Sequence, residues 1–189
     1  MQNRIAANLK ESIEVKQQVI KSLVPQIEKA ARAMIGALKN GNKVLFFGNG
    51  GSAADSQHLA AELISRFQME RKSLPAIALT TDTSIITAIG NDYTFDNIFS
   101  RQIEGLAQKG DIAFGLSTSG NSKNVIAGLE KAKQLGCKTI GLVGSGGRIA
   151  AIAEIAIAVP SKNTPRVQEC HITIGHILCS LIEQELFGK

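Results

Sequence analysis

The stretch VLFFGNGGSAADSQHLAAEL, residues 44–63, decides the fold. It opens with an apolar run typical of a buried strand. Gly48, Gly50 and Gly51 then permit a tight turn with close backbone approach, and Ser52 is a candidate cap for the helical pattern that follows. A strand, a glycine turn and a helix in this order are the unit from which parallel α/β sheets are built.

Four further apolar runs have the length and composition of strands, namely AIALT (76–80), DIAFGL (111–116), KTIGLV (138–143) and EIAIAV (154–159). Helical patterns separate most of these runs, which indicates a parallel sheet covered on both faces. We therefore predict an α/β fold with a doubly wound, five-stranded parallel sheet flanked by helices, in a single domain over residues 1–189 whose core is 41–160.

Helical patterns occupy both ends of the chain. Residues 1–40 are predicted to form a helical hairpin, because apolar residues recur at helical intervals before and after Pro25, at Ile5, Leu9, Ile13, Ile20 and Leu23, and at Ile27, Ala31, Met34 and Leu38. A long C-terminal helix is predicted over residues 163–187 from the spacing of Val167, Cys170, Ile174, Ile177, Leu178 and Leu181.

The composition narrows the class of protein. The chain has 189 residues, 44% of them hydrophobic and 20% charged, as in globular proteins. No apolar run reaches the roughly 18 residues of a membrane span, and the first residues are too polar for a signal peptide, so we expect a cytoplasmic protein with no membrane partner. The net charge of +5 is scattered, and one tyrosine with no tryptophan argues against nucleic acid. Three cysteines without metal-type spacing are expected to be buried thiols.

The glycine turn permits two interpretations. GNGGSA satisfies the dinucleotide fingerprint G-x-G-x-x-G/A, with Asp82 as a candidate ribose partner. A simple turn between a strand and a helix explains the same residues. A phosphate-loop NTPase is excluded, because no GK[ST] follows the glycines.

The segment STSGNS, residues 117–122, follows the strand 111–116 and precedes a helical pattern. A capped turn needs one hydroxyl, whereas this segment offers four, from Ser117, Thr118, Ser119 and Ser122. Together with the backbone N–H groups at a helix start, these hydroxyls predict a phosphate site that requires no lysine or arginine.

All three histidines fall in two predicted helices. His58 and Glu62 are four residues apart and share one helix face. They could form an internal hydrogen bond, lie on a solvated face, ligate a metal, or act as a base and its partner. His171 and His176 lie in the C-terminal helix with Gln168, and periodicity alone does not choose between these two histidines. Gln168 and His176 are about 12 Å apart along that helix, so a site with both is wide or completed by a neighbouring subunit.

With these residues in view, the chain resembles the sugar isomerase (SIS) domain family, and within it the bacterial phosphoheptose isomerases. The segments that carry the resemblance run nearly end to end and are GNGGSAAD, QHLAAEL, SRF, AIGNDYTFDNIFSRQ, GDIAFGLSTSGNSKNV and RVQECHITIGHIL. The resemblance implies an SIS fold and an aldose-ketose isomerase that converts D-sedoheptulose 7-phosphate to D-glycero-D-manno-heptose 7-phosphate through an enediol. It also implies the first step of ADP-heptose synthesis for lipopolysaccharide, a homotetramer with active sites between subunits, and zinc.

The resemblance further assigns roles to residues of this sequence. It implies a proton-transfer pair, Glu62 and His176, and four zinc ligands, His58, Glu62, Gln168 and His176. The substrate contacts that it implies are Asn49, Gly50, Gly51, Ser52, Glu62, Arg66, Asn91, Asp92, Ser117, Thr118, Ser119, Ser122 and Gln168. His171 has no assigned counterpart. Metal ligation and base action are in tension at Glu62, and how the carboxylate divides them stays open.

A relative of another class supplies the alternative function. A tetrameric regulator that binds a replication-initiator protein resembles this chain at MQNRIAANLKESI and SLPAIALTTD. That relative lacks the acidic and imidazole groups at the positions of Glu62 and His176, which are intact here. We therefore favour the enzyme over the regulator, and both over a dinucleotide-dependent oxidoreductase.

Overall fold

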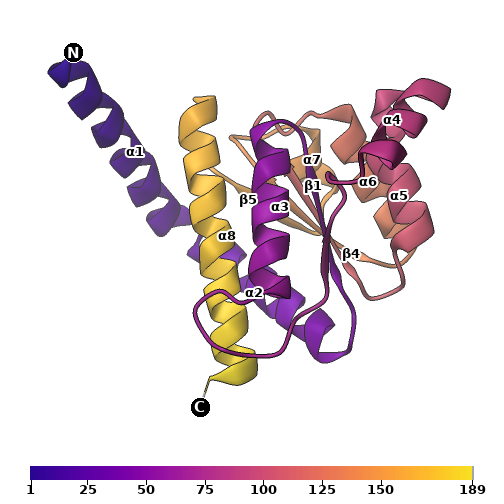
Figure 1. Cartoon of the computed structure of the whole chain (residues 1–189). Helices are drawn as coiled ribbons and strands as arrows, with labels where there is room; N and C mark the ends of the chain where they lie inside the picture. The colour runs from indigo at the N-terminus through magenta and orange to yellow at the C-terminus, as the bar shows by residue number, and fades with distance from the viewer. Residues whose placement is uncertain (189) are drawn as a thin grey trace.

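The computed structural model describes residues 1–188 and has at its centre a sheet of five parallel strands (Figure 1). The strands are β1 (Val44–Gly48), β2 (Ala76–Ala78), β3 (Ile112–Ser117), β4 (Lys138–Val143) and β5 (Ile155–Ala158). Each overlaps one of the five predicted runs, with ends that differ by at most two residues. Their order is β2-β1-β3-β4-β5, which confirms the doubly wound parallel sheet.

The strand order places the topological switch point between β1 and β3. The chain passes from β1 to β2 on one side and then returns to place β3 on the other side of β1, with Gly48 in register with Leu116. Ligands of such sheets bind beyond the carboxyl ends of the strands at this point. The glycine loop after β1 and the serine-rich loop after β3 therefore lie side by side there.

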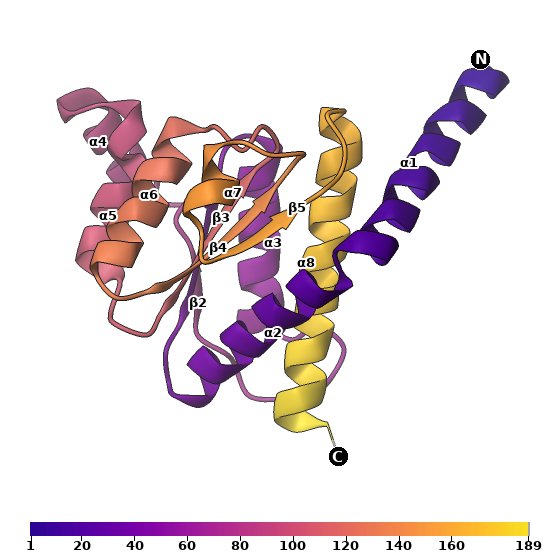
Figure 2. The ribbon, with the colours of Figure 1, turned by 180° about the vertical axis from the view of Figure 1, so that it is seen from behind.

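Helices cover both faces of the sheet (Figures 1 and 2). Phe46 and Phe114 pack with helices α2 (Val24–Lys39), α3 (Gly51–Ile64) and α8 (Thr164–Phe187), whereas Leu45 and Phe47 pack with α5 (Ile98–Leu106), α6 (Lys123–Gln134) and α7 (Arg148–Ile152). Successive residues of a strand point to opposite faces, so the continuous apolar runs supply both layers. Helix α4 (Thr83–Asp92) and the 3₁₀ turn η1 (Phe95–Asn97) connect β2 to α5.

The N-terminal helices differ from the prediction. Helix α1 (Gln2–Ser22) and α2 are both present, but α1 projects from the body and α2 continues in a similar direction, so residues 1–40 do not form a hairpin (Figures 1 and 2). One residue, Leu23, separates the helices in a right-handed helical conformation (φ −115°, ψ −6°). A reversal needs a loop of about 2–5 residues. The break is instead a kink beside Pro25, which supplies no N–H to the first turn of α2.

Because α1 projects, most of its predicted apolar stripe is uncovered. Val15, Val19 and Leu23 are buried, whereas Ile5, Leu9, Ile13 and Ile20 are exposed. Helix α8 spans residues 164–187, close to its predicted bounds of 163–187. That the whole chain is one domain stays a prediction. Among the described residues, no helix combines the length and the apolar character needed to cross a bilayer.

Candidate active site

Two neighbouring helices, α3 and α8, carry the histidines and Glu62. They lie side by side and run in the same direction (Figure 1). Gly175 permits their close approach, because a Cβ atom at this position would lie 2.5 Å from Cδ2 of Leu59. Nearer the start of both helices, the side-chain amide of Gln168 lies against Gly51 and would collide with any Cβ there. The packing therefore places successive turns of α3 opposite successive turns of α8.

His58, Glu62 and His176 meet within one chain at the contact between α3 and α8, which we call the seam. His58 Nε2 lies 3.0 Å from Glu62 Oε1 and 3.0 Å from His176 Nε2. The potential ligand atoms of the three residues all lie within 4.8 Å of one another. The structure thus selects His176 over His171 as the histidine that joins the predicted His-Glu pair.

The chemistry of this cluster fits a metal ion. Two imidazoles and one carboxylate are the donor set of several catalytic zinc sites, which keep a further position open for water or substrate. The His58 side chain is 50% exposed, so the cluster is accessible from one side. These three residues could therefore hold a metal ion. Gln168 lies at the level of Gly51, two turns before His176, and its role as a fourth ligand stays a prediction.

Asp55 belongs to the same face of α3 and was not predicted. It is buried, and its Oδ2 atom has no hydrogen-bond partner among the described residues. Burial raises the pKa of Asp55, while His58 and the side chain of Gln168 act in the opposite direction. Asp55 therefore connects the Gln168 end of the seam with the histidine cluster. Its spacing of three residues from His58 is the sequence signal that could have identified it.

The serine-rich loop contains a network of hydroxyl groups between β3 and α6. Ser117 Oγ lies 2.8 Å from Ser122 Oγ and 3.3 Å from Ser119 Oγ, and Thr118 lies between them in the chain. Ser122 is the N-cap residue of α6, yet its side chain makes no capping hydrogen bond. The hydroxyls and the first N–H groups of α6 are thus available to an anion, as the predicted phosphate site requires.

The glycine loop is attached to the same helix. The side-chain amides of Asn49 and Asn124 exchange two hydrogen bonds of 2.8 Å, which join the loop after β1 to α6. The prediction that Ser52 caps α3 is wrong, because the N-cap residue is Gly50 and Ser52 is buried inside the first turn. Asp82, the alternative ribose partner, caps α4 by accepting a hydrogen bond from Ile85 N at 2.9 Å.

Two predicted substrate contacts, Asn91 and Asp92, lie away from the His58 cluster in the single chain, whereas a third, Arg66, follows α3 four residues after Glu62. Arg66 is exposed and pairs with Glu70 at 3.6 Å. Asn91 Nδ2 donates to Asp92 Oδ1 at 2.8 Å, and both residues are exposed at the end of α4. Helix α4 and helix α8 lie at opposite sides of the sheet (Figure 1). One chain therefore does not bring Asn91 and Asp92 to Glu62 and His176.

The three cysteines are free and buried, as predicted. Burial raises the pKa of Cys137 to about 11, and burial together with Glu62 and Glu183 raises the pKa of Cys179 to about 12. Both thiols are therefore neutral and unreactive at pH 7.

His171 is fully buried against the sheet side of α8. Burial lowers the pKa of His171 from its ordinary value of 6.5 to about 4, although the backbone of Val143 raises it in part. As the pH falls below 6.5, the unfolded chain takes up a proton that the folded chain does not. The stability contributed by neutral His171 is therefore complete above pH 6.5 and is lost between pH 6.5 and 4.

We expect His171→Leu to flatten the pH dependence of stability in this window. The free energy of unfolding of the unsubstituted protein should fall by about 3 kcal/mol more than that of the variant between pH 6.5 and pH 4, at about 1.4 kcal/mol per pKa unit. Denaturant titrations at fixed protein concentration measure both profiles. Asp111 and Glu183, whose pKa values are lowered, act in both proteins and cancel in the difference. Parallel profiles would contradict a neutral buried imidazole.

The fold and the site together define a class, a doubly wound α/β enzyme of the sugar-phosphate isomerase type, in which a hydroxyl-rich loop accompanies a His-Glu cluster. The sequence profile of the SIS domain matches residues 8–144. The phosphoheptose isomerase of Geotalea daltonii is 60% identical over 186 residues, which cover 96% of this chain and 97% of that relative. The phosphoheptose isomerase of Aquifex aeolicus is 56% identical over 185 residues, and the match covers 97% of this chain and 97% of that relative.

A solved structure supports the same assignment. The phosphoheptose isomerase from Neisseria gonorrhoeae matches with a TM-score of 0.92 and 46% identity over 97% of this chain and 98% of that one. The chain therefore belongs to the SIS domain family, among its phosphoheptose isomerases.

Proposed function

We propose that this protein converts D-sedoheptulose 7-phosphate to D-glycero-D-manno-heptose 7-phosphate, the first step of ADP-heptose synthesis for lipopolysaccharide. The observation that carries the proposal is the meeting of a carboxylate and two imidazoles, from Glu62, His58 and His176, on parallel helices. The relatives named phosphoheptose isomerase favour this enzyme over a regulator that binds a replication initiator.

Isomerisation requires two kinds of proton transfer. A proton leaves one carbon and returns to its neighbour, while the two oxygens exchange a proton through an enediol. Glu62 is the group proposed to act at carbon, and His176 is proposed to serve as acid or base at the oxygens. The cluster places one carboxylate and an imidazole that can donate or accept within 4.8 Å of each other, which supports this division of roles.

We further propose that zinc binds at His58, Glu62 and His176, with Gln168 as fourth ligand. A bound zinc ion supplies a Lewis acid that polarises the carbonyl group. A carboxylate has two oxygens, so Glu62 can offer one as a ligand and keep the other for the proton. His58 Nε2 and His176 Nε2 lie 3.0 Å apart, so the two nitrogens proposed to bind zinc already face each other between α3 and α8.

The phosphate is proposed to bind at Ser117, Thr118, Ser119 and Ser122, beside the glycine loop with Asn49, Gly50 and Gly51. Phosphate and carbonyl lie at opposite ends of a heptose 7-phosphate. A substrate of this kind therefore needs an anion site that is separate from its proton-transfer groups.

The active protein is proposed to be a cytoplasmic homotetramer with sites between subunits. Two observations support this assembly. Ile5, Leu9, Ile13 and Ile20 form an exposed apolar stripe on the projecting α1. Asn91 and Asp92 end α4, which lies at the opposite side of the sheet from α8 and its His176 (Figure 1). A neighbouring subunit could bring Asn91 and Asp92 to the His58 cluster.

The test of this function is direct turnover. Purified protein is incubated with sedoheptulose 7-phosphate, and formation of the aldose is followed by chromatography or NMR. Aldose formation supports the isomerase. Binding to a replication-initiator protein in the absence of any aldose would favour the regulator.

Ser122→Ala should raise KM for the sugar phosphate by about 10-fold, with a smaller change in kcat. The reason is the loss of one hydrogen bond to a charged group, about 1.5–3 kcal/mol. Steady-state kinetics measure the effect. Ser100→Ala is the matched control, because the Ser100 hydroxyl in α5 donates to the backbone oxygen of Asn97 in η1 at 3.2 Å. An unchanged KM in Ser122→Ala would remove this loop from phosphate binding.

A further inference from the structure

The loop that follows α3 is fixed by a buried ion pair between Arg71 and Glu183. Arg71 Nε lies 2.9 Å from Glu183 Oε1, and each side chain is only 1% exposed. Arg71 belongs to the loop between α3 and β2, whereas Glu183 belongs to the last turns of α8. The pair therefore joins two segments that are 112 residues apart.

Arg71 satisfies the last carbonyl groups of α3. Its terminal nitrogens donate to the backbone oxygens of Glu62 and Leu63, both at 2.7 Å, and further bonds go to Ser65 and Lys72 at 3.2 and 3.1 Å. Carbonyl groups at a helix C-terminus have no partners within the helix, and a cation there also complements the helix dipole. The guanidinium thus caps α3 and binds the backbone of Glu62 itself.

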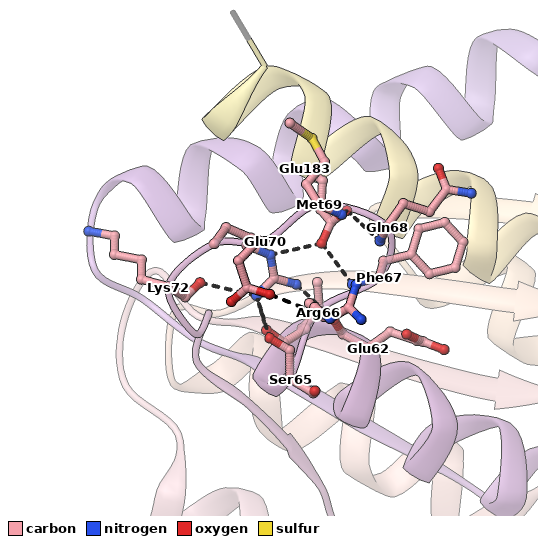
Figure 3. Close-up of polar contacts among 11 residues, drawn as sticks. Glu62, Ser65, Arg66, Phe67, Gln68, Met69, Glu70, Lys72 and Glu183 are labelled. Atoms are coloured by element: carbon pink, nitrogen blue, oxygen red, sulfur yellow. Dashed lines mark hydrogen bonds and ion pairs between the residues drawn. The ribbon is translucent and has the colours of Figure 1, made fainter.

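Glu183 holds the other half of the loop. Its carboxylate accepts hydrogen bonds from three consecutive backbone N–H groups, those of Phe67 (2.7 Å), Gln68 (2.8 Å) and Met69 (2.9 Å). Burial acts to raise the pKa of Glu183, but these N–H groups and Arg71 outweigh it, so the pKa lies below its ordinary value. The carboxylate is therefore a fixed anion at the centre of the loop (Figure 3).

Both ends of this arrangement reach the candidate active site. Glu183 follows His176 by seven residues, which is about two helical turns and returns to the same face of α8. Phe67, whose N–H group binds Glu183, also packs its ring against His176, with 5.5 Å between ring centroids. Arg71 holds the backbone of Glu62. One ion pair is thus connected to both members of the proposed proton-transfer pair.

We propose that Arg71 and Glu183 are positioning residues that set the separation between the Glu62 carboxylate and the His176 imidazole. The inference rests on the proposed isomerisation. A buried ion pair often stabilises a fold no more than apolar residues of the same volume would. Arg71 and Glu183 instead fix the position of the end of α3 relative to the last turns of α8. An error of about 1 Å in the placement of reacting groups can lower a rate by about 10²-fold.

The experiment compares Glu183→Gln with Asp111→Asn. Asp111 is a matched buried carboxylate, because it pairs with Lys43 Nζ at 2.6 Å and accepts from the backbone N–H groups of Lys43 and Gln108 at 3.0 and 2.8 Å. It precedes β3, at the edge of the sheet opposite the serine-rich loop. Both variants should melt at lower temperature than the unsubstituted protein.

Only Glu183→Gln should lose catalysis. At a temperature where both variants are folded, we expect its kcat to fall by about 10²-fold, with KM within about threefold because the serine-rich loop is untouched. Its affinity for zinc, measured by competition with a chromophoric chelator, should weaken by about 10-fold, as when an outer-shell partner is lost. Asp111→Asn should keep both its kcat and its zinc affinity.

A second variant, Arg71→Lys, keeps the charge but cannot form the fork of bonds to Glu62 and Leu63. It is measured in parallel and should show the same kcat loss, so the inference can be tested even where Glu183→Gln does not fold. Unchanged kcat and zinc affinity in a folded variant, or equal losses in Asp111→Asn, would overturn the positioning role. An unsubstituted protein without turnover of sedoheptulose 7-phosphate would instead count against the proposed function.

Discussion

Glu62→Gln is expected to lower kcat for sedoheptulose 7-phosphate by about 10⁴-fold, the upper end of the contribution of a positioned proton-transfer group. The amide cannot take a proton from carbon, and it is also a weaker metal ligand than the carboxylate. The side chain is 22% exposed and has nearly the same shape as glutamine, so the fold should survive the change. Steady-state kinetics and melting curves measure the two effects separately.

The control for this substitution is Glu154→Gln. Glu154 is exposed and precedes β5, at the edge of the sheet opposite the serine-rich loop. Its kcat should match that of the unsubstituted protein. Near-normal turnover in Glu62→Gln would remove Glu62 from proton transfer and would leave the transfer at carbon without an assigned group.

Removal of metal is the second change with a large expected effect. Dialysis against a zinc chelator should lower turnover by about 10³-fold, because Lewis-acid stabilisation is worth several kcal/mol and each 1.4 kcal/mol is a factor of ten in rate. Added zinc should restore the rate. Metal content, measured by atomic spectroscopy, should fall and recover in step with activity.

His58→Ala separates a metal effect from damage by the chelator. His58 is one of the proposed zinc ligands, so the variant should contain little zinc before any treatment, and its remaining activity should be insensitive to the chelator. Full turnover in a protein that contains no measurable metal would contradict a catalytic role for zinc.

The sheet and its two functional loops could be predicted because the signals are local. Each buried strand is a continuous apolar run, and the glycines and hydroxyls occupy the few residues directly after β1 and β3. The shared helix face of His58 and Glu62 could also be predicted from their spacing, since it depends only on helical periodicity.

The features that could not be predicted from the sequence depend on contacts between distant segments. Periodicity left His171 and His176 equivalent, and only the parallel packing of α3 on α8 directs His176 to His58 and His171 to the sheet. Nothing in the sequence near Arg71 indicates that Glu183 is its partner, because that contact forms only after both helices have packed. An interrupted apolar pattern is the same for a kink and for a reversal, so the sequence does not distinguish the kink at Leu23 from a hairpin.

The projecting α1 has a consequence for how firmly the molecule holds together. In the proposed tetramer, the apolar side of α1 would be covered by another copy of the chain, and its contribution to stability would follow mass action. Dilution alone then weakens the fold without any change in sequence, temperature or pH, and the concentration of the enzyme in the cell becomes one of the conditions for its integrity.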